Sequence, residues 1–453
     1  MTDDITPRLL DPLFSTDGMR AVFSDESVLQ GMLDFEAALA VAQGALGVIP
    51  SDAAPSIQQK CDARHFNITE LARATRDAGN VAIPLIKALT SLVAQDAPAA
   101  AGYVHWGATS QDAIDSGLAR QLRRALHLIE IDATTLARAL EQLAKRHETT
   151  PMIGRTWLQH AVPITFGLKA AGWLTAVDRA RARVTRAGRD ACVLQFGGAA
   201  GSLSAHGDDG IAIGRAVAAE LDLEFPELPW HAHRDRLVDL GAALGIFIGT
   251  LGKIARDVSL LMQTEVSEVA EPTPAGRGGS STMPQKRNPV ASTVALAAAV
   301  RAPGLVATLL AAMPQEHERG VGGWHAEWET LPELFLLASG SLHQMSAAIA
   351  DLAVDSERMQ QNLESGHGLA MAEQVMMALA PAIGREHAHR VVEAATRRAI
   401  DEGRHLKDVL LEDAAARTHL TAALLDRLFL TDAHVKAAGR LVRGVLDSRG
   451  ARA

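Results

Sequence analysis

The residues best suited to chemistry lie in one glycine- and proline-rich segment, Gly279-Ser280-Ser281-Thr282-Met283-Pro284-Gln285-Lys286-Arg287-Asn288-Pro289. Its serines supply hydroxyls, Lys286 an ammonium and Asn288 a carboxamide. Glycines at the start give a mobile backbone, and prolines at the end stiffen the exit. Such a set can hold a carboxylate while the oxygen of Ser280 approaches a C–H bond. A solvated linker between two helices is the competing interpretation of a polar loop.

Two further polar segments interrupt a chain that otherwise has helical patterning. Val104 to Asp112 has the sequence VHWGATSQD and precedes a long helical stretch. Gly154 to Gly167 has the sequence GRTWLQHAVPITFG and is predicted to start as a loop that Pro163 breaks. Long irregular stretches in a helix-rich chain are usually functional or disordered. Both segments therefore hold candidate site residues.

Three long helices are predicted to position these segments. Apolar residues recur at steps of three and four from about Asp115 to Glu148, which is typical of one helical stripe. Arg236 to Val266 is predicted to form a second helix, and Pro289 to Met313 a third with a kink at Pro303. Four glycines of the second helix lie close to one face and would admit a close neighbour: Gly241, Gly245, Gly249 and Gly252.

Composition supports the same architecture. Alanine is abundant in the 453 residues, while aromatic residues make up 4%. Alanine and leucine favour helices, whereas β-branched and aromatic residues favour sheets. We predict an all-α fold in which a long central helical bundle, residues 111–355, lies between smaller helical N-terminal (1–110) and C-terminal (356–453) domains.

The charge pattern excludes some classes of partner. The formal net charge is −9, without a polybasic block, which disfavours nucleic-acid or acidic-membrane binding. The uncharged run 240–252 is too short to span a bilayer, and the apolar stretch after Val290 is interrupted by Arg301 and Pro303. We therefore expect neither stretch to be a membrane span.

The cysteine content and the first residues indicate a cytoplasmic protein. Cys61 and Cys192 are the only cysteines, too few for a disulfide framework or a thiolate metal site. The first four residues, Met1-Thr2-Asp3-Asp4, are acidic and do not resemble a signal peptide.

The three polar segments resemble motifs of one enzyme family. Gly279 to Pro289 resembles the signature loop GSSxMPxKxNP of the fumarase/aspartase superfamily and matches it at every defined position. VHWGATSQD resembles the family's H-x-G-x-T-S-x-D element, and GRTWLQHAVPITFG resembles its G-R-T-H-x-Q segment. Residues 362–410 resemble the family's tail domain, so the likeness covers nearly the whole chain.

The resemblance implies a set of site residues. Ser280 is the implied proton-transfer residue, placed by closure of the loop. The expected site contains no metal and no cofactor, and the implied assembly is a homotetramer whose active sites are each built from three chains. The residues expected to bind substrate are His105, Thr109, Ser110, Thr156, Trp157, Gln159, His160, Ser281, Met283, Lys286, Asn288 and Arg319.

The chain departs from the family at two positions that many members use together. A histidine is replaced by Trp157, and a glutamate five residues after the loop asparagine is replaced by Thr293. Tryptophan does not titrate near neutrality, and threonine cannot orient an imidazolium as a carboxylate does. A carboxylate leaving group needs no such dyad, because its pKa is about 4. The substitutions therefore favour opening or closure of a lactone, in which positioning supplies much of the rate.

The overall sequence most resembles the family branch that interconverts a carboxylated muconate and its lactone. The implied partner is a small polycarboxylate, which needs more positive charge than Lys286 supplies. Arginine forks suit carboxylates best. Candidates are Arg155, His160, Arg287, His317, Arg319 and His325, of which about half are expected to be structural, because the two kinds of charge network look alike in sequence. Arg319 and His160 are preferred, and Arg155 has the alternative of anchoring its loop.

Other interpretations stay open at this point. The runner-up activity is a fumarate-releasing lyase of the adenylosuccinate or argininosuccinate type, and a non-catalytic, crystallin-like structural protein is a third. Trp157 either covers a planar substrate or fills the space left by the family histidine. His231 and His233 lie in WHAHRDRL, where a metal site is not expected because no cysteine lies near.

Overall fold

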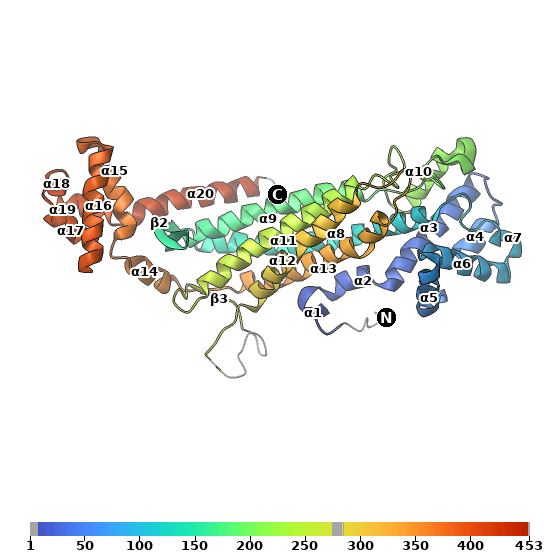
Figure 1. Cartoon of the computed structure of the whole chain (residues 1–453), viewed down its shortest axis with the longest axis horizontal. Coiled ribbons are helices and arrows are strands. Elements are labelled where there is room, and N and C mark those ends of the chain that lie inside the picture. Colours follow the sequence, from blue (N-terminus) through green and yellow to red (C-terminus); the bar gives the residue numbers. More distant parts are fainter. Residues whose placement is uncertain (1–7, 274–282, 284, 452–453) are drawn as a thin grey trace. The chain divides into compact units, whose positions relative to one another are not determined.

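The computed structural model describes residues 8–273, 283 and 285–451. This part of the chain is mainly helical, and its named strands form two small two-stranded sheets (Figure 1). The predicted all-α class is confirmed. The first helices are α1 (Asp11–Phe14), α2 (Asp17–Val22), α3 (Asp25–Ala45), α4 (Ala53–Gln58), α5 (Ile68–Ala78), α6 (Ala82–Asp96) and α7 (Pro98–Ala101), with a 3-10 turn at Ala63–His65.

Long helices make up the middle of the chain. They are α8 (Ser110–Arg146), α9 (Phe166–Ala191), α11 (Asp235–Leu261), α12 (Val290–Ala312) and α13 (Gly323–Ala350), while a 3-10 turn (Ser204–Asp209) and α10 (Gly210–Glu220) lie between α9 and α11. The predicted helices 115–148, 236–266 and 289–313 are confirmed as α8, α11 and α12. Pro303 lies inside α12, which continues on both sides of it.

Shorter helices follow the last long one. They are α14 (Ser356–Glu364), α15 (Ala372–Ile383), α16 (Arg385–Glu402), α17 (Leu406–Glu412), α18 (Ala414–His419), α19 (Ala422–Leu428) and α20 (Asp432–Gly450), with a 3-10 turn at Leu369–Met371. The strands are β1 (Pro151–Thr156), β2 (Gln159–Thr165), β3 (Val269–Ala270) and β4 (Ala353–Val354). Both strand pairs are antiparallel.

The β1–β2 hairpin corrects the prediction that residues 154–167 start as a loop. Proline is tolerated where a strand needs no N–H donor. Pro163 lies opposite Ile153 in the hairpin, and the register shifts between Ile153 and Arg155. A proline in a helix-rich chain therefore marked a short strand rather than a break.

The chain forms two compact units. Unit 1 consists of Met1–Thr134, Arg179–Gly252 and Val294–Gln344. Unit 2 consists of Thr135–Asp178, Lys253–Thr293 and Met345–Ala453. The three-part division at residues 110 and 355 stays a prediction.

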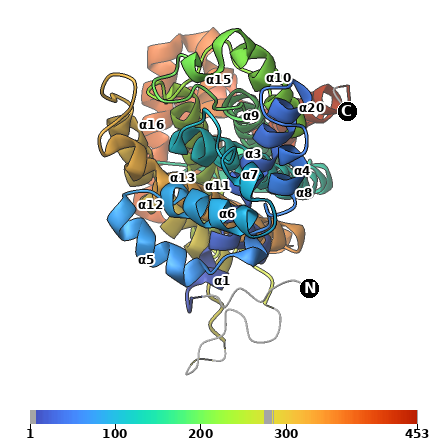
Figure 2. The ribbon, with the colours of Figure 1, turned by 90° about the vertical axis from the view of Figure 1, so that its right-hand side faces the viewer.

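Close backbone contacts fix the helices of unit 1, in which α3, α4, α6 and α7 gather together (Figures 1 and 2). A Cβ on Gly117 of α8 would lie 2.8 Å from the backbone carbon of Gly31 on α3, so only glycine allows the two helices to approach this closely. Three of the four glycines predicted to admit a neighbour also do so. Their neighbours are side chains of α12, with Leu309 facing Gly241, Val306 facing Gly245 and Ala299 facing Gly252.

Unit 2 has its own apolar core among the C-terminal helices. Val375 and Leu379 of α15 pack with Ala388 of α16 and with Leu406 and Leu410 of α17. These five side chains are fully buried. This core joins α15, α16 and α17 within unit 2.

Two long helices are apolar enough to cross a membrane by length and composition, α11 with mean hydropathy 1.6 and α12 with 1.8 over the best window. The window of α11 is 61% buried, as is typical of a core helix, whereas that of α12 is only 28% buried. Core helices of soluble proteins commonly pass this test. The apolar surface of α12 therefore has little cover from the described part of this chain.

Candidate functional site

The first group of predicted site residues lies in unit 1, in the loop from Val104 to Thr109 and the start of α8. The backbone is in the left-handed region at His105 (φ +59°) and Gly107 (φ +71°). The predicted irregular segment ends at Thr109, because Ser110 is already the first residue of α8. The Asp112 carboxylate accepts the Thr109 N–H at 3.1 Å, so the TSQD sequence begins the helix as half of a capping box.

Asp112 also ties this loop to two others. Its fully buried carboxylate accepts the N–H groups of Gly197 at 3.1 Å and Gly198 at 2.9 Å. The same carboxylate bonds His231 Nε2 at 2.7 Å. His231 therefore belongs to the buried hydrogen-bond network around Asp112. In the described residues, no group of three histidine, cysteine or acidic side chains could hold a metal ion.

The ring of His105 is held by a carboxylate of α3. Its Nδ1 bonds Glu36 Oε1 at 2.6 Å, and the Glu36 side chain is fully buried. Burial lowers the pKa of His105, but the charge and hydrogen bond of Glu36, with a contribution from Asp112, outweigh it and raise the pKa above its ordinary value. An imidazolium is therefore favoured at this position.

Arg319 contacts the same loop from the connection between α12 and α13. Its guanidinium donates to Thr109 Oγ1, Gln111 Oε1 and Ala199 O, each at 3.1 Å. All three acceptors are neutral, so they orient the guanidinium without cancelling its charge. The structure thus brings together Thr109 and Arg319, two residues that are distant in sequence and were both predicted for the site.

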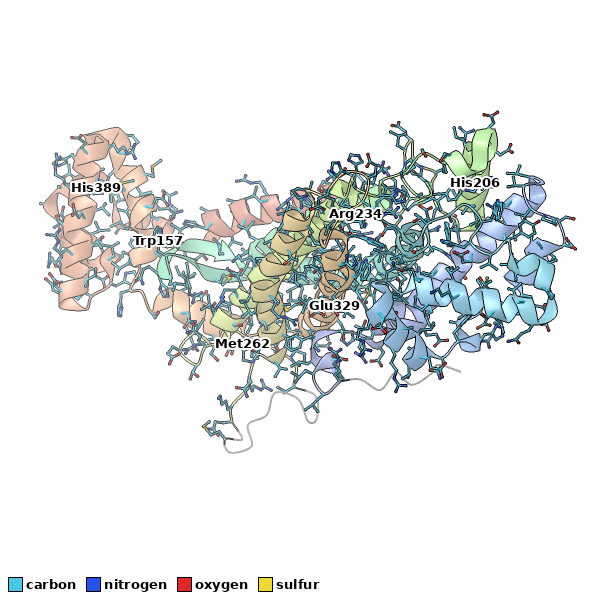
Figure 3. The ribbon with its side chains drawn as sticks, turned by 45° about the vertical axis from the view of Figure 1, so that its right-hand side comes forward. Trp157, His206, Arg234, Met262, Glu329 and His389 are labelled. Carbon is cyan, nitrogen blue, oxygen red and sulfur yellow. The ribbon has the colours of Figure 1, made fainter. Side chains whose placement is uncertain are left out.

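A buried triad of charged side chains joins α8, the start of α11 and α13 in the same unit. Arg234, labelled in Figure 3, donates to Asp115 at 2.6 Å and to Glu327 at 2.6 Å. All three side chains are about 1% exposed or less. Burial opposes the charge of Arg234, but the two carboxylates outweigh it and raise its pKa well above the usual range. Trp324 Nε1 donates to Asp115 at 3.0 Å and completes the set.

His325 and His317, two further candidates for polycarboxylate binding, lie near this group in the chain but bond differently. His325 is exposed, and its Nε2 contacts the Gly79 carbonyl at 3.2 Å. His317 is exposed with φ +44°. Neither side chain joins the network of Thr109 and Arg319.

The second group lies in unit 2, at the turn of the β1–β2 hairpin. Thr156 and Gln159 are a strand pair on either side of Trp157 and Leu158, both in the left-handed region with φ +52° and +63°. Asparagine and glycine are the usual residues of such a turn. Trp157 is 97% exposed and stands at the hairpin tip (Figure 3), so it is no part of the core of this chain. Bulky residues in a strained, exposed turn are typical of a functional position.

Arg155 and His160 flank that turn and differ in their contacts. Arg155 forms a two-pronged ion pair with buried Glu268 at 2.7 and 2.9 Å, and Glu268 also accepts Asn362 Nδ2 at 2.9 Å. These contacts favour the anchoring alternative for Arg155. His160 is exposed, and partial burial together with the Arg155 charge lowers its pKa. It is therefore a neutral donor or acceptor near pH 7 rather than a cation.

The third group is the signature segment, also in unit 2. Ser280 and Ser281 lie outside the described residues. Met283 is 43% exposed, Lys286 is exposed and Asn288 is half-buried. These residues lead directly into α12, whose first residue is Val290.

Glu271, which lies eight residues before Gly279 in the sequence, contacts the start of α12. Its buried carboxylate accepts Ala291 N–H and Ser292 N–H, each at 2.9 Å, and the Ser292 hydroxyl at 2.7 Å. It thereby occupies the positive N-terminus of α12. Glu271 thereby joins the chain on the two sides of the residues that the structure does not describe.

Several important residues carried little signal in the sequence. Glu36 was detectable in principle, as the one charged residue in the otherwise apolar run from Phe35 to Ala42. Glu271 was visible only as the first residue of a polar loop. Gly107 belongs to the HWGATSQD motif, but the reason why a glycine is required there lies outside the motif. A Cβ at this position would lie 2.7 Å from His206 Nε2. That His206 packs there depends on the fold, so no local pattern predicts it.

The fold and these groups define the chain as a lyase of an all-helical family. The family model described as "Lyase" matches residues 14–304, and the model "Adenylosuccinate lyase C-terminus" matches residues 368–445. The chain belongs to this lyase family, within the fumarase/aspartase superfamily that its sequence resembles.

Several proteins similar to this chain over nearly its full length share one enzyme name or a closely related one. The 3-carboxy-cis,cis-muconate cycloisomerase of Pseudomonas aeruginosa is 55% identical over 96% of this chain and 94% of its own length. That of Bradyrhizobium diazoefficiens is 50% identical over 99% of both chains. The crystal structure of 3-carboxy-cis,cis-muconate lactonizing enzyme from Pseudomonas putida superposes with a TM-score of 0.91 at 48% identity, covering 97% of this chain and 98% of that one.

Proposed function

We propose that this chain is a 3-carboxy-cis,cis-muconate cycloisomerase, which interconverts 3-carboxy-cis,cis-muconate and 4-carboxymuconolactone. The observation that carries the proposal is the 50–55% identity to proteins of that name over nearly the full length. The activity belongs to the protocatechuate branch of the β-ketoadipate pathway of aromatic degradation.

The two positions of the missing dyad support a reaction with a carboxylate leaving group. Thr293 has its hydroxyl engaged within α12, donating to Pro289 O at 2.8 Å, so it does not orient a base. Trp157 offers a ring surface and no titratable proton. A carboxylate with a pKa of about 4 leaves without protonation, whereas an amine or hydroxide does not. Lactone chemistry therefore needs only the half of the machinery that moves the carbon-bound proton.

Ser280 is the proposed proton-transfer residue. In lactonisation, a substrate carboxylate oxygen forms a C–O bond to one carbon of the substrate's own C=C bond. The other carbon of that bond, α to another carboxylate, takes the proton of the Ser280 hydroxyl, which becomes an alkoxide. In the reverse β-elimination, the Ser280 alkoxide accepts that proton, the C=C bond forms again, and the ring carboxylate leaves as its C–O bond breaks. Lys286 and backbone N–H groups stabilise the enediolate-like state between these steps. Glu271, which binds the start of α12, is proposed to be needed for this role of Ser280.

Arg319 is the proposed fork for an additional substrate carboxylate. Its acceptors are all neutral, so its charge is still available to an anion. Thr109 lies in contact with it and offers a hydroxyl to the same carboxylate. Arg155 is not assigned this role, because Glu268 already neutralises it.

A homotetramer with shared active sites is part of the proposal. The support is the apolar surface of α12, where Val300 is 79% and Leu310 53% exposed. The hairpin tip adds Leu158, which is 73% exposed next to Trp157. Exposed apolar surface of this extent is typical of an interface.

A soluble, cytoplasmic location is also part of the proposal, and it is supported by the two cysteines, which are unpaired and buried.

A substrate panel tests the activity against its alternatives. The purified enzyme is mixed with 3-carboxy-cis,cis-muconate, adenylosuccinate and argininosuccinate, with and without a chelator. The expected result is chelator-resistant loss of the diene absorbance with the muconate only. Fumarate release from either succinate adduct would support the lyase alternative, and no turnover of any compound would favour the structural protein.

A further inference from the structure

One helix outside the signature motifs supports the loop that carries His105 and Thr109. Helix α3 presents two buried polar residues seven positions apart, Glu36 and Gln43, which are 1% and 0% exposed. That spacing places them on the same face, two turns apart. Glu36 bonds His105 Nδ1 at 2.6 Å, and Gln43 Nε2 donates to the Trp106 carbonyl at 2.8 Å. Two consecutive residues of the loop are therefore held by one helix face.

The position of α3 is itself fixed against the start of α8. The helices touch where Gly31 and Gly117 meet, with a hypothetical Gly31 Cβ only 3.0 Å from the Gly117 backbone. Glu36 lies on α3 five residues beyond Gly31, and Asp112 on α8 five residues before Gly117. The close contact of the two backbones thus fixes the part of α3 from which the Glu36 side chain extends toward His105.

His105 is the single side chain that pairs with Glu36 within the described part of the chain. The second oxygen, Glu36 Oε2, has no hydrogen-bond partner among those residues. A buried carboxylate without a cationic partner costs roughly several kcal/mol. The two charged groups that act on His105 are Glu36 from α3 and Asp112 from α8, both of them acidic. This environment favours the imidazolium over the neutral ring.

The backbone gives a second indication that His105 is deliberately held. A non-glycine residue with φ +59° is uncommon, and such conformations concentrate at functional sites. With Nδ1 committed to Glu36, Nε2 is the nitrogen left to meet a ligand. The ring is 16% exposed, enough for contact at one edge.

We propose that Glu36 is a positioning residue that keeps His105 as an imidazolium, whose Nε2–H binds a carboxylate of the substrate. The inference rests on the proposed function, because His105 would supply the tricarboxylate substrate with one more cation, in addition to Lys286 and Arg319. It assigns charge to a histidine that would otherwise be neutral above pH 7.

The raised pKa of His105 sets the expected pH dependence. A histidine with a raised pKa keeps its proton above the ordinary value of about 6.5, and loses it as the pH rises through the new value. kcat/KM should therefore fall on the alkaline side as His105 deprotonates. Losing this binding contact should raise KM more than it lowers kcat.

Glu36→Gln tests the proposal with little change in volume, because the amide oxygen can still accept the Nδ1–H bond. Removing an opposite charge at this distance lowers the histidine pKa by about 1–3 units, so the alkaline limb of kcat/KM should move down by at least about one pH unit. At a pH above the wild-type pKa of His105, a drop of one unit corresponds to a loss of roughly tenfold in kcat/KM. Glu36→Asp should restore part of the shift.

Gln43→Met is the matched control on the same helix face. It removes a bond to the same loop without changing any charge, so the variant should lose thermal stability and keep the wild-type alkaline limb. A purely structural role of α3 would give both variants the same pH profile. That outcome would overturn the proposal.

A titration without substrate separates this inference from the proposed activity. NMR of histidine labelled at Cε1, with His105 assigned by its absence in His105→Asn, follows the pKa directly. Equal His105 titration in the wild type and Glu36→Gln overturns the Glu36 assignment, even if the muconate is turned over. A lowered titration in Glu36→Gln supports the assignment. If the muconate is then not consumed, the proposed function fails instead.

Discussion

Glu271 offers the sharpest test of how the signature segment is held. The change is Glu271→Gln, which removes one negative charge from a buried site that accepts three hydrogen bonds of 2.7–2.9 Å. Hydrogen bonds to a charged group contribute about 1.5–3 kcal/mol each, and a carboxylate at a helix N-terminus adds about 0.3–1 kcal/mol. Glutamine keeps one acceptor oxygen but turns two donors toward backbone N–H groups. The net cost should be about 2–4 kcal/mol.

Glu265→Gln is the matched control for this charge. Glu265 is exposed, and its backbone carbonyl accepts a hydrogen bond from Arg358, which the substitution leaves in place. Scanning fluorimetry should show the melting temperature of Glu271→Gln roughly 2–4 °C below that of the control, at about 1 °C per kcal/mol for a chain of 453 residues. Turnover should fall in Glu271→Gln as well, because the segment that carries Ser280 loses its anchor.

Two outcomes would contradict this role of Glu271. If both variants melt at the same temperature, Glu271 does not stabilise the start of α12 in the way its hydrogen bonds indicate. If Glu271→Gln melts lower but turns over substrate at the wild-type rate, the anchor is structural only. Its link to the position of Ser280 would then be wrong.

Three further changes test other parts of the structure. Arg234→Met should lower unfolding free energy by about 3–5 kcal/mol in urea titrations, because it leaves two buried carboxylates without their cation; unchanged stability would contradict the triad. Gly107→Ala should destabilise the protein through contact with the ring of His206, and His206→Ala should partly rescue it; an additive double variant would refute the coupling. Burial raises the pKa of Cys192 to about 12 and that of Cys61 still higher. Neither thiol of the folded protein should therefore react with iodoacetamide at pH 8, whereas both should react in urea. Rapid labelling of the folded protein would contradict the burial of these thiols.

Much of the architecture could be predicted because it depends on local patterns. Apolar residues at steps of three and four marked α8, and its predicted span differs from the observed one by a few residues at each end. The polar segments were located for the same reason, since an interruption of helical patterning is visible in one dimension. The hairpin was missed because β1 and β2 are short and contain a proline, which sequence alone treats as a break.

The site could be predicted only where its chemistry is written into motifs. Thr109 and Arg319 were both named, but their contact depends on how distant segments fold together. The role of Arg155 was left open in the sequence, and a partner more than a hundred residues away, Glu268, favours anchoring. Glu36 was missed because its function exists only through His105. Pairings of this kind follow from tertiary structure, which no local spacing encodes.

The role of Ser280 is tested by following the absorbance of 3-carboxy-cis,cis-muconate with the wild-type enzyme and Ser280→Ala in parallel, with the product identified by NMR. The wild type should consume the diene and yield 4-carboxymuconolactone. Ser280→Ala should still bind the substrate but lose at least about a hundredfold in kcat, the minimum typical of a missing proton-transfer group. Full activity in Ser280→Ala, or a product other than the lactone, would contradict the proposed mechanism.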